Sequence, residues 1–419
     1  MSRDLEIATI RRRFPALSRT QDGQSVAFFD GPAGSQVPAA VADAVRDYLL
    51  QTNANTHGAF STSRATDKIV RDAAVAVADF IGASHEARAH ELIVFGQNMT
   101  SLTFAFSRAL AQTWKPGDEI IVSRLDHDAN ITPWVLAAKD RGVTVHRIDV
   151  RSEDCTLRLD QLSDRLCDRT RLLAVGAASN ATGTINPIAR IAKMVHGVGG
   201  QLFVDAVHYA PHRLIDVAAW GCDYLVCSAY KFFGPHVGML WGRRPLMASL
   251  PAYQVRPAGD ATPGRWTTGT QSFEAIAGTK AAIDYLAEIG GVNVSSHPQG
   301  RRSGLVHAYE RIVDHETRLA ERLLRGLRAD PAITVYGISE PERRTERCPT
   351  VAFTHSRHTP RVVAEKLAAQ GIYAWSGNLY AFELSEALGL EPEGMVRVGI
   401  LHYNTASEVE RLLDAVRAL

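Results

Sequence analysis

The stretch GQLFVDAVHYAPHRLIDVAAWGCDYLVCSAYKFFGPHVGMLWG, residues 200–242, contains three short apolar runs and the segments that join them. The runs GQLFVDA (200–206) and DYLVCS (223–228) are separated by a helical pattern at 214–220. This order is typical of parallel strands joined by a helical crossover. The third run, VGMLWG (237–242), follows too closely for such a crossover, so an antiparallel strand is expected there.

The same alternation of apolar runs and amphipathic segments extends toward the N-terminus. Further runs occur at 91–95, 118–123, 144–150 and 171–179. Helical patterns lie between and around them, at 67–81, 101–113, 129–141 and 187–198. Together with residues 200–242, this order predicts an α/β fold in which helices cover both faces of a mostly parallel sheet.

The pattern changes after about residue 300, and a chain of 419 residues is too long for one simple core. Long helical patterns at 305–329, 359–370 and 406–418 there surround short runs at 333–337, 349–354 and 395–400. The Pro-, Gly- and Thr-rich stretch 251–272 predicts an exposed loop. We predict an N-terminal segment 1–25 that packs with the small domain, a large domain 26–299 and a small C-terminal α+β domain 300–419.

Composition narrows the class of protein. Apolar residues make up 46% of the chain and charged residues 22%, and the formal net charge is +1, so neither nucleic acid nor a membrane is expected as a partner. Five cysteines without a C-x-x-C spacing indicate reduced thiols. Without a long apolar run or a signal peptide, a cytoplasmic location is expected. His85 and His90 are five residues apart and do not share a helix face, so no metal site is predicted.

Two of the predicted strands end at residues that can carry chemistry. Asp205 closes the run 200–206, and Lys231 follows the run 223–228, three residues after Ser228. Because parallel strands end on the same edge of a sheet, a carboxylate and an amine are expected to face one crevice. Taken singly, an aspartate at a strand end is more often a helix cap, and a lysine after a strand is more often a surface residue.

This pair of groups is what pyridoxal 5'-phosphate requires. The lysine binds the cofactor as a Schiff base and later acts as a base, while the carboxylate keeps the pyridine nitrogen protonated so that the ring can accept electrons. The phosphate requires backbone N–H groups and hydroxyls, which the turn at 96–101 offers through Met99 and Thr100 ahead of a predicted helix. Ser228 and Tyr230 offer further hydroxyls.

Longer motifs agree with this interpretation. From about residue 28 to residue 415 the chain resembles the class V aminotransferases of fold type I, and among them the cysteine desulfurases. The resemblance implies the large PLP-binding domain and small domain of that fold type, a pyridoxal-phosphate-dependent enzyme, and an amino acid as substrate. It rests on FFDGPAGSQVP (28–38), NTHGAFSTSRAT (55–66), LDHDANITPW (125–134), SNATGTINPI (179–188), VDAVHYAPHRLIDV (204–217), CDYLVCSAYKFFGPHVGMLWGR (222–243), TGTQSFEAIAG (268–278) and RVGILHYNT (397–405).

The resemblance also implies roles for single residues. Lys231 resembles the Schiff-base lysine and Asp205 the partner of the pyridinium. His127 resembles the histidine that stacks on the cofactor ring and shuttles protons. The remaining implied contacts are Asn180 and His208 beside the 3-oxygen of the cofactor, Met99, Thr100, Ser228 and Tyr230 at the phosphate, Thr270 lent to the phosphate by the second subunit of a homodimer, and Arg397 at the substrate carboxylate. For His57 two interpretations stay open, a place at the substrate entrance and the cap of a turn.

The sequence departs from the desulfurases at three places. These enzymes usually have glutamine where this chain has His208, and often histidine where it has Tyr230. They also carry a mobile cysteine that attacks the substrate sulfur, on a loop upstream of the carboxylate-binding arginine. The corresponding stretch GIYAWSGNLYAFEL (371–384) contains no cysteine, and Tyr380 or a neighbour occupies that place. Cys348 lies in an apolar context and is expected to be a core residue.

Three hypotheses follow. The first is a cysteine-desulfurase-like C–S lyase that removes the Cα proton and eliminates a thiolate from cysteine, cystine or a cysteine S-conjugate. The second is another reaction of the same cofactor, by an epimerase, aminotransferase or decarboxylating enzyme of secondary metabolism. The third is a non-catalytic binding protein, against which the presence of Lys231, Asp205 and Arg397 argues.

Overall fold

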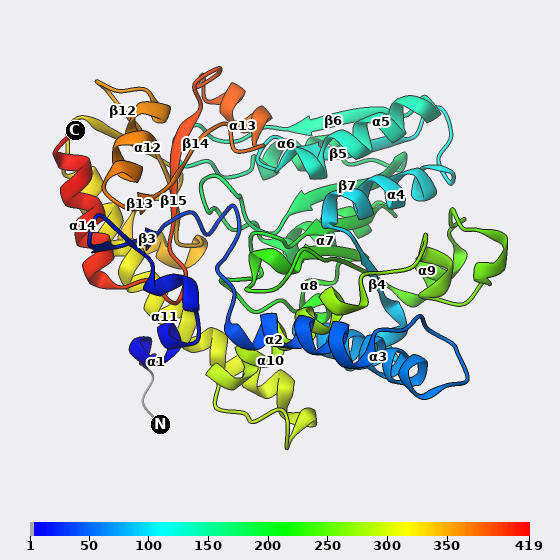
Figure 1. Ribbon diagram of the computed structural model, residues 1–419. Helices are drawn as coiled ribbons and strands as arrows, with labels where there is room; N and C mark the ends of the chain where they lie inside the picture. Colours follow the sequence, from blue (N-terminus) through cyan, green and yellow to red (C-terminus); the bar gives the residue numbers. More distant parts are fainter. Residues whose placement is uncertain (1–3) are drawn as a thin grey trace.

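The computed structural model describes residues 4–419 and places seven strands in one central sheet (Figure 1). The strand order is β4-β10-β9-β8-β7-β5-β6, and β10 alone of these is antiparallel to its neighbours. The predicted mostly parallel sheet, with an antiparallel strand at 237–242, is therefore confirmed. The strands are β4 (Ile93–Gly96), β5 (Glu119–Ser123), β6 (Thr144–Ile148), β7 (Thr170–Gly176), β8 (Gln201–Asp205), β9 (Tyr224–Ser228) and β10 (Gly238–Gly242).

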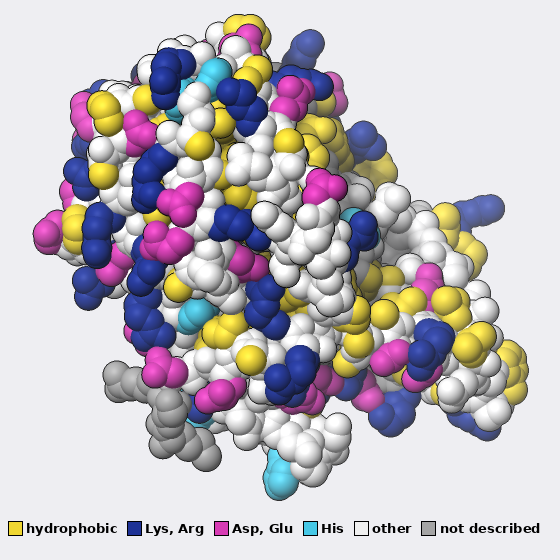
Figure 2. Space-filling view, turned by 60° about the vertical axis from the view of Figure 1, so that its left-hand side comes forward, with side chains coloured by type: hydrophobic (Ala, Val, Ile, Leu, Met, Phe, Trp, Pro, Cys, Tyr) yellow, Lys and Arg dark blue, Asp and Glu magenta, His cyan; other side chains and the backbone are white. Residues whose placement is uncertain are grey.

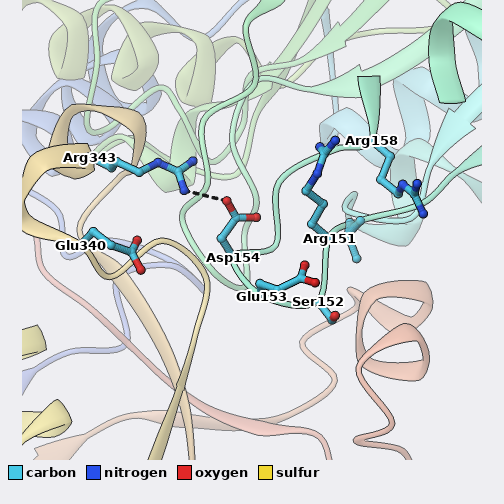
Figure 3. Close-up of a pocket in the computed structure, with 8 residues that line it drawn as sticks. Arg151, Ser152, Glu153, Asp154, Arg158, Glu340 and Arg343 are labelled. Carbon is cyan, nitrogen blue, oxygen red and sulfur yellow. Dashed lines mark hydrogen bonds and ion pairs between the residues drawn. The ribbon is translucent and has the colours of Figure 1, made fainter. Parts of the chain in front are cut away.

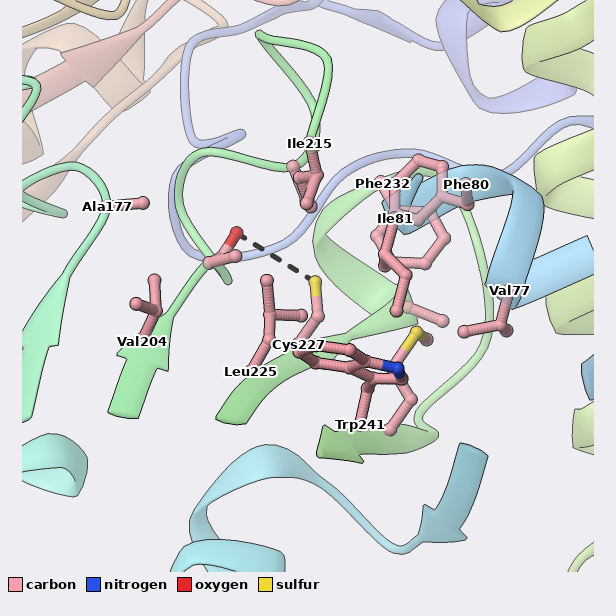
Figure 4. Close-up of a cluster of buried hydrophobic side chains, with 14 of the residues drawn as sticks. Val77, Phe80, Ile81, Ala177, Val204, Ile215, Leu225, Cys227, Phe232 and Trp241 are labelled. Carbon is pink, nitrogen blue, oxygen red and sulfur yellow. Dashed lines mark hydrogen bonds between the residues drawn. The ribbon is translucent and has the colours of Figure 1, made fainter. Parts of the chain in front are cut away.

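Alternate residues of these strands belong to two different hydrophobic clusters, one on each face of the sheet. Ile121 of β5 and Val204 of β8 belong to one cluster, whereas Ile120 and Phe203 belong to the other. This two-residue period is expected for strands that are buried on both faces. Figure 4 shows part of the first cluster, in which the Cys227 thiol lies 3.9 Å from the carbonyl oxygen of Ala206.

Helices cover both faces of the sheet, as the sequence predicts. α4 and α5 contribute Phe106 and Trp134 to the Phe203 cluster, and α3 and α10 contribute Val77 and Ile283 to the other. The helices around this sheet are α2 (Ala39–Asp47), α3 (Ser61–Ile81), α4 (Met99–Ala111), α5 (Thr132–Arg141), α6 (Leu159–Arg165), α7 (Ile188–His196), α8 (Val217–Trp220), α9 (Arg244–Ser249) and α10 (Phe273–Ile289).

The C-terminal part of the chain forms a separate four-stranded antiparallel sheet with a third hydrophobic cluster. Its strand order is β11-β12-β15-β14, and the helices lie beside it at one end of the molecule (Figure 1). The elements are α11 (Arg301–Arg328), β11 (Ile333–Tyr336), β12 (Thr350–His355), α12 (Pro360–Ala369), β14 (Trp375–Gly377), α13 (Phe382–Ala387), β15 (Met395–Gly399) and α14 (Ala406–Arg417).

The N-terminal segment packs against this C-terminal part. Arg11 of α1 (Ile7–Arg12) forms an ion pair of 3.0 Å with Glu408 of α14, and β3 (Ala27–Phe28) pairs in parallel with β13 (Ile372–Tyr373). Between α1 and β3, the chain forms a short hairpin of β1 (Thr20–Gln21) and β2 (Gln24–Ser25). Residues 1–3 of the predicted segment 1–25 lie outside the described residues, and the division into three regions stays a prediction.

The surface carries both signs of charge. On the face shown in Figure 2, basic and acidic side chains are interspersed rather than gathered into one patch of a single sign. In the predicted loop 251–272, Tyr253 and Val255 are exposed. None of the helices within residues 4–419 has the length and apolar character needed to cross a membrane.

Candidate active site

A cavity lies where the strands of the central sheet end, and most of the predicted site residues line it. β5, β8 and β9 each end just before one of these residues, and the turn after β4 closes one side. Crevices at the carboxyl ends of parallel strands are where open α/β sheets bind ligands. The lining residues are Met99, Thr100, Asp126, His127, Gly176, Ala178, Asn180, Asp205, Val207, His208, Tyr230 and Lys231.

Lys231 follows β9 in a short helical turn that aims its amine at the N-terminal segment. The Nζ atom donates hydrogen bonds to the carbonyl oxygens of Pro32, at 2.5 Å, and Ala33, at 3.0 Å. Burial, together with the positive charge of Arg397, lowers the pKa of Lys231 to about 7, and Asp205 opposes this shift. An amine with this pKa is partly neutral near pH 7, as an attack on an aldehyde requires.

The lowered pKa of Lys231 predicts how cofactor uptake depends on pH. Because only the neutral amine attacks the aldehyde, uptake of pyridoxal phosphate by the cofactor-free protein should fall about tenfold per pH unit below 7 and level off above it. The pH at which the uptake rate is half of its maximum should be lower in Asp205→Asn, because the Asp205 carboxylate raises the pKa of Lys231. Stopped-flow absorbance measures the rate, and a rate that still climbs tenfold per unit above pH 9 would contradict the assignment.

Asp205 is the last residue of β8 and is buried. Its Oδ1 atom accepts a hydrogen bond of 2.8 Å from the backbone N–H of Val207. Burial raises the pKa of Asp205 to about 6, against the effects of that hydrogen bond and of Lys231. A buried carboxylate with one hydrogen bond is short of positive partners, which a protonated pyridine nitrogen would supply.

His127 follows β5 and presents a neutral ring to the cavity. Its Nδ1 atom accepts a hydrogen bond of 3.0 Å from the backbone N–H of Ala129, which places the ring hydrogen on Nε2. Burial, with the positive charges of Lys231 and Arg397, lowers the pKa of His127 to about 4. The ring also stacks on that of Tyr380, with centroids 5.3 Å apart and planes at 13°. His127 is therefore held as a flat, neutral surface suited to stacking.

The turn before α4 forms the end of the cavity predicted for the phosphate. Asn98 caps the helix by accepting from Ser101 N–H at 2.9 Å. A Cβ atom at Gly238 of β10 would lie 2.3 Å from the Asn98 carbonyl carbon, so only glycine admits the turn at this position. The Ser228 hydroxyl accepts the Met99 N–H at 2.9 Å and does not line the cavity. Thr100 lines it directly.

Arg397 on β15 reaches the site from the small sheet. Its Nη1 atom donates to the carbonyl oxygen of Asn180 at 2.8 Å, and its buried Nε has no hydrogen-bond partner within residues 4–419. Burial lowers the pKa of Arg397 to about 10, against the effect of nearby Asp30, so it stays charged at neutral pH. A buried guanidinium with a free N–H suits a substrate carboxylate.

The loop after β14 covers the His127 side of the cavity. The Asn180 Nδ2 donates to the Leu379 carbonyl at 2.8 Å, and the Asp128 N–H donates to the Tyr380 carbonyl at 2.7 Å. Leu379 and Tyr380 both have positive φ angles, of 60° and 58°. Two consecutive residues in this unfavourable region indicate that the contacts fix the loop conformation.

Two predicted site residues lie elsewhere. His57 and Thr270 line a second pocket, formed by the start of α3 and the loop 251–272, and neither lines the cavity that contains Lys231. The backbone N–H of His57 donates to the Asp67 carboxylate at 3.1 Å. If Thr270 contributes to the active site of the second subunit, it is expected to lie away from the cavity of its own chain, as it does. The roles assigned to Thr270 and to His57 both stay predictions.

Two carboxyl groups of the site are not among the predicted residues, the buried Asp126 and the half-buried Asp30. Asp126 lines the cavity, accepts hydrogen bonds from Ser123 Oγ and Asn130 Nδ2 at 2.8 Å each, and has its pKa raised to about 7 by burial. Asp30 lies near Arg397, and burial raises its pKa to about 6. Asp126 lies in the motif LDHDAN and Asp30 in the motif FFDGPAGSQVP. Their position in these two motifs is the feature of the sequence from which both residues could have been predicted.

A third pocket lies away from this site and is lined by charged side chains (Figure 3). Asp154 accepts from Arg343 at 2.7 Å, and Asp160 pairs with both Arg151 and Arg158, at 3.0 and 3.2 Å. The three arginines that line this pocket therefore all form ion pairs with carboxylates. The cavity around Lys231 differs, because some of its buried polar atoms have no partner within the described residues. Residues 4–419 contain no cluster of three or more metal-ligating side chains.

The fold and the site define a pyridoxal-phosphate-dependent enzyme of fold type I. A buried amine with a lowered pKa, a buried carboxylate and a flat neutral imidazole line one cavity, and the buried Asn180 Oδ1 and His208 Nε2 atoms lack partners within residues 4–419. These groups fit the cofactor. Residues 27–412 match the family described as aminotransferase class-V, and the chain belongs to that family.

Known relatives cover nearly the whole chain. The aminotransferase-like protein FGM3 of Gibberella zeae is 34% identical over 99% of this chain and 98% of its own length. A cysteine desulfurase of Cronobacter sakazakii is 32% identical over 96% of both chains. Among solved structures, the apo cysteine desulfurase of Thermococcus onnurineus is similar with a TM-score of 0.86 and 25% identity, over 100% of this chain and 98% of that one.

Proposed function

We propose that this enzyme is a cysteine-desulfurase-like C–S lyase that cleaves the Cβ–S bond of cysteine, cystine or a cysteine S-conjugate. The observation that carries the proposal is the placement of its thiols. None of the five cysteines lines the cavity described within residues 4–419. A C–S lyase needs no enzyme thiol, because the sulfur leaves with the electron pair of its bond to Cβ.

Each cysteine is placed where it cannot act on the substrate. Cys155, Cys222, Cys227 and Cys348 are buried, as the sequence predicts for Cys348, and burial raises the pKa of each thiol. Cys167 is half-buried, 3.5 Å from Glu119 Oε2, and precedes the first residue of β7. It therefore lies near the edge of the sheet opposite the site.

The cavity residues would support an elimination together with Arg397, which does not line the cavity but contacts it through Asn180. Arg397 binds the substrate carboxylate, and Lys231 removes the Cα proton. Pyridoxal phosphate, when bound, would supply an electron sink for the pair left at Cα. Cleavage of the Cβ–S bond would then release the sulfur as a thiolate, which takes up a proton, and water would convert the rest of the substrate to pyruvate and ammonia. Cysteine and water thus give hydrogen sulfide, pyruvate and ammonia in equal amounts.

The subunits of a homodimer are part of the proposal. Thr270, His57 and Val255 line one pocket at the surface, and Phe60 lies three residues after His57. Phe60 and Val255 are large hydrophobic residues with 59% and 61% of their surface exposed. Exposed hydrophobic residues rimmed by polar ones are typical of contact surfaces. A second subunit bound to this surface would bring Thr270 of one subunit to the cofactor phosphate of the other. We further propose that the enzyme is located in the cytoplasm.

Product analysis with thiol alkylation tests the lyase. With cysteine or an S-alkyl cysteine, pyruvate and the thiol product should appear in a 1:1 ratio, and with cystine an equal amount of persulfide should accompany the pyruvate. Prior treatment with iodoacetamide should leave at least about 80% of the activity, because four of the thiols are buried and the half-buried Cys167 does not line the cavity. Tyr380→Cys, which places a thiol on the exposed loop, is the positive control for alkylation. Alanine with enzyme-bound sulfur, or retention of the whole carbon skeleton, would contradict the proposal.

A further inference from the structure

A buried histidine and a buried glutamate form a pair directly behind the cavity. His212 lies in the turns that follow β8, and Glu316 lies in the middle of α11. The Nδ1 atom of His212 is 2.9 Å from Glu316 Oε2, and both side chains are 1% exposed. The steps of the proposed elimination use neither group.

This pair reaches the cavity through His208. The rings of His208 and His212 lie with centroids 5.4 Å apart and planes at 66°. His208 lines the cavity, and its Nε2 atom has no hydrogen-bond partner within residues 4–419. Within residues 4–419, the Nε2 atom of His212 is also buried without a partner. Two rings in contact, each with an unpartnered buried nitrogen, mark a site with unused hydrogen-bonding capacity.

The proton arrangement of the pair follows from its burial. A net charge at this depth is costly, so the pair is expected to be neutral as a whole. It is then either an imidazolium with a carboxylate or a neutral imidazole with a protonated carboxyl group. In both arrangements His212 Nε2 carries a hydrogen, because Nδ1 is engaged with Glu316. The ring that packs against His208 is therefore an imidazole with its hydrogen on Nε2, and its orientation is set by the contact with Glu316.

We infer that His212 and Glu316 are positioning residues for His208, which fix its ring orientation and its proton arrangement toward the cofactor. Burial lowers the pKa of His208, and neighbouring positive groups add to this effect. The carboxyl group of Glu316 faces His212, Arg213 and the backbone of His402. The groups that face His208 are His212 from its own segment, Arg397 from β15, Lys231 after β9 and His127 after β5.

The first test is a measurement on the unaltered chain, with one variant used only to assign the signals. In the holoenzyme with ¹⁵N-labelled histidine, the ring nitrogens of His208, assigned by their loss in His208→Gln, should report one neutral tautomer over the range around pH 6.5 in which an ordinary histidine titrates. Titration of His208 within that range, or a mixture of tautomers, would overturn the inference.

The second test is a double-mutant cycle on the visible absorbance of the bound cofactor, followed against pH. Glu316→Gln should move the absorbance midpoint by about 0.5 pH unit or more, roughly a threefold change in proton affinity. In a His208→Gln background the same substitution should move it by less than about a third of that amount. An equal shift in both backgrounds would show that Glu316 acts electrostatically on the cofactor without His208, and this result would overturn the inference.

Two further variants keep this test decisive. His315→Gln alters the neighbouring residue on α11, whose ring bonds to the Asn404 carbonyl at 2.9 Å, and should leave the midpoint unchanged. If Glu316→Gln does not fold, His212→Asn takes its place in the cycle. The absorbance midpoint does not depend on which reaction the enzyme catalyses, so failure of the lyase assay leaves this inference standing.

Discussion

Replacing Lys231 by alanine is expected to abolish both cofactor attachment and turnover. The amine lies in the cavity with its pKa lowered to about 7, and no second lysine is among the described residues that line the cavity. Loss of both the attachment point and the base should reduce kcat by about 10⁴-fold or more. Visible absorbance after dialysis and a pyruvate assay measure the two effects.

A surface lysine provides the control for this substitution. Lys193 of α7 is exposed, so Lys193→Ala should keep both the absorbance and the turnover of the unaltered enzyme. If Lys231→Ala instead retained its yellow colour after dialysis together with measurable pyruvate formation, the assignment of the cofactor lysine would be wrong.

Replacing Arg397 by alanine is expected to raise KM far more than it changes the cofactor absorbance. The guanidinium is buried, charged at neutral pH and has an unpartnered Nε within the described residues. A hydrogen bond to a charged group contributes about 1.5–3 kcal/mol, so KM should rise roughly 10- to 100-fold. Steady-state kinetics and the absorbance spectrum separate the two effects.

Two arginine variants sharpen this result. Arg397→Lys keeps the charge but loses the planar fork, so an intermediate KM is expected. Arg361→Ala removes an exposed arginine that pairs with Glu365 on α12, and should leave KM unchanged. An unaltered KM in Arg397→Ala would remove Arg397 from the substrate site.

Much of the fold was predictable from local patterns. The runs at 118–123 and 200–206 became strands β5 and β8, and the patterns at 101–113 and 406–418 became α4 and α14, within a few residues at each end. Strand periodicity and helix periodicity are properties of neighbouring residues, so they can be read along the chain. The close spacing of 223–228 and 237–242 likewise implied the antiparallel β10.

The chain order also implied the chemistry. Asp205 ends β8, and Lys231 lies three residues after the end of the neighbouring parallel strand β9. This topology brings a carboxylate and an amine to one edge of the sheet. Together with the motif LDHDAN, this placement predicts pyridoxal phosphate from the sequence alone. The same residues are compatible with elimination and with other reactions of that cofactor.

Other features depend on contacts between distant residues, and no local pattern announces them. Tyr380 meets His127 only because the loop after β14 folds over the end of β5, and Arg397 reaches Asn180 from a different sheet. From the sequence alone, Glu316 is expected to be one of the surface charges of a highly charged helix. In the structure, α11 places its carboxyl group against His212. The sequence determines which groups the chain carries and on which strand ends they stand. Their burial, and with it their pKa values and hydrogen-bond partners, arises only when segments a hundred or more residues apart exclude water together.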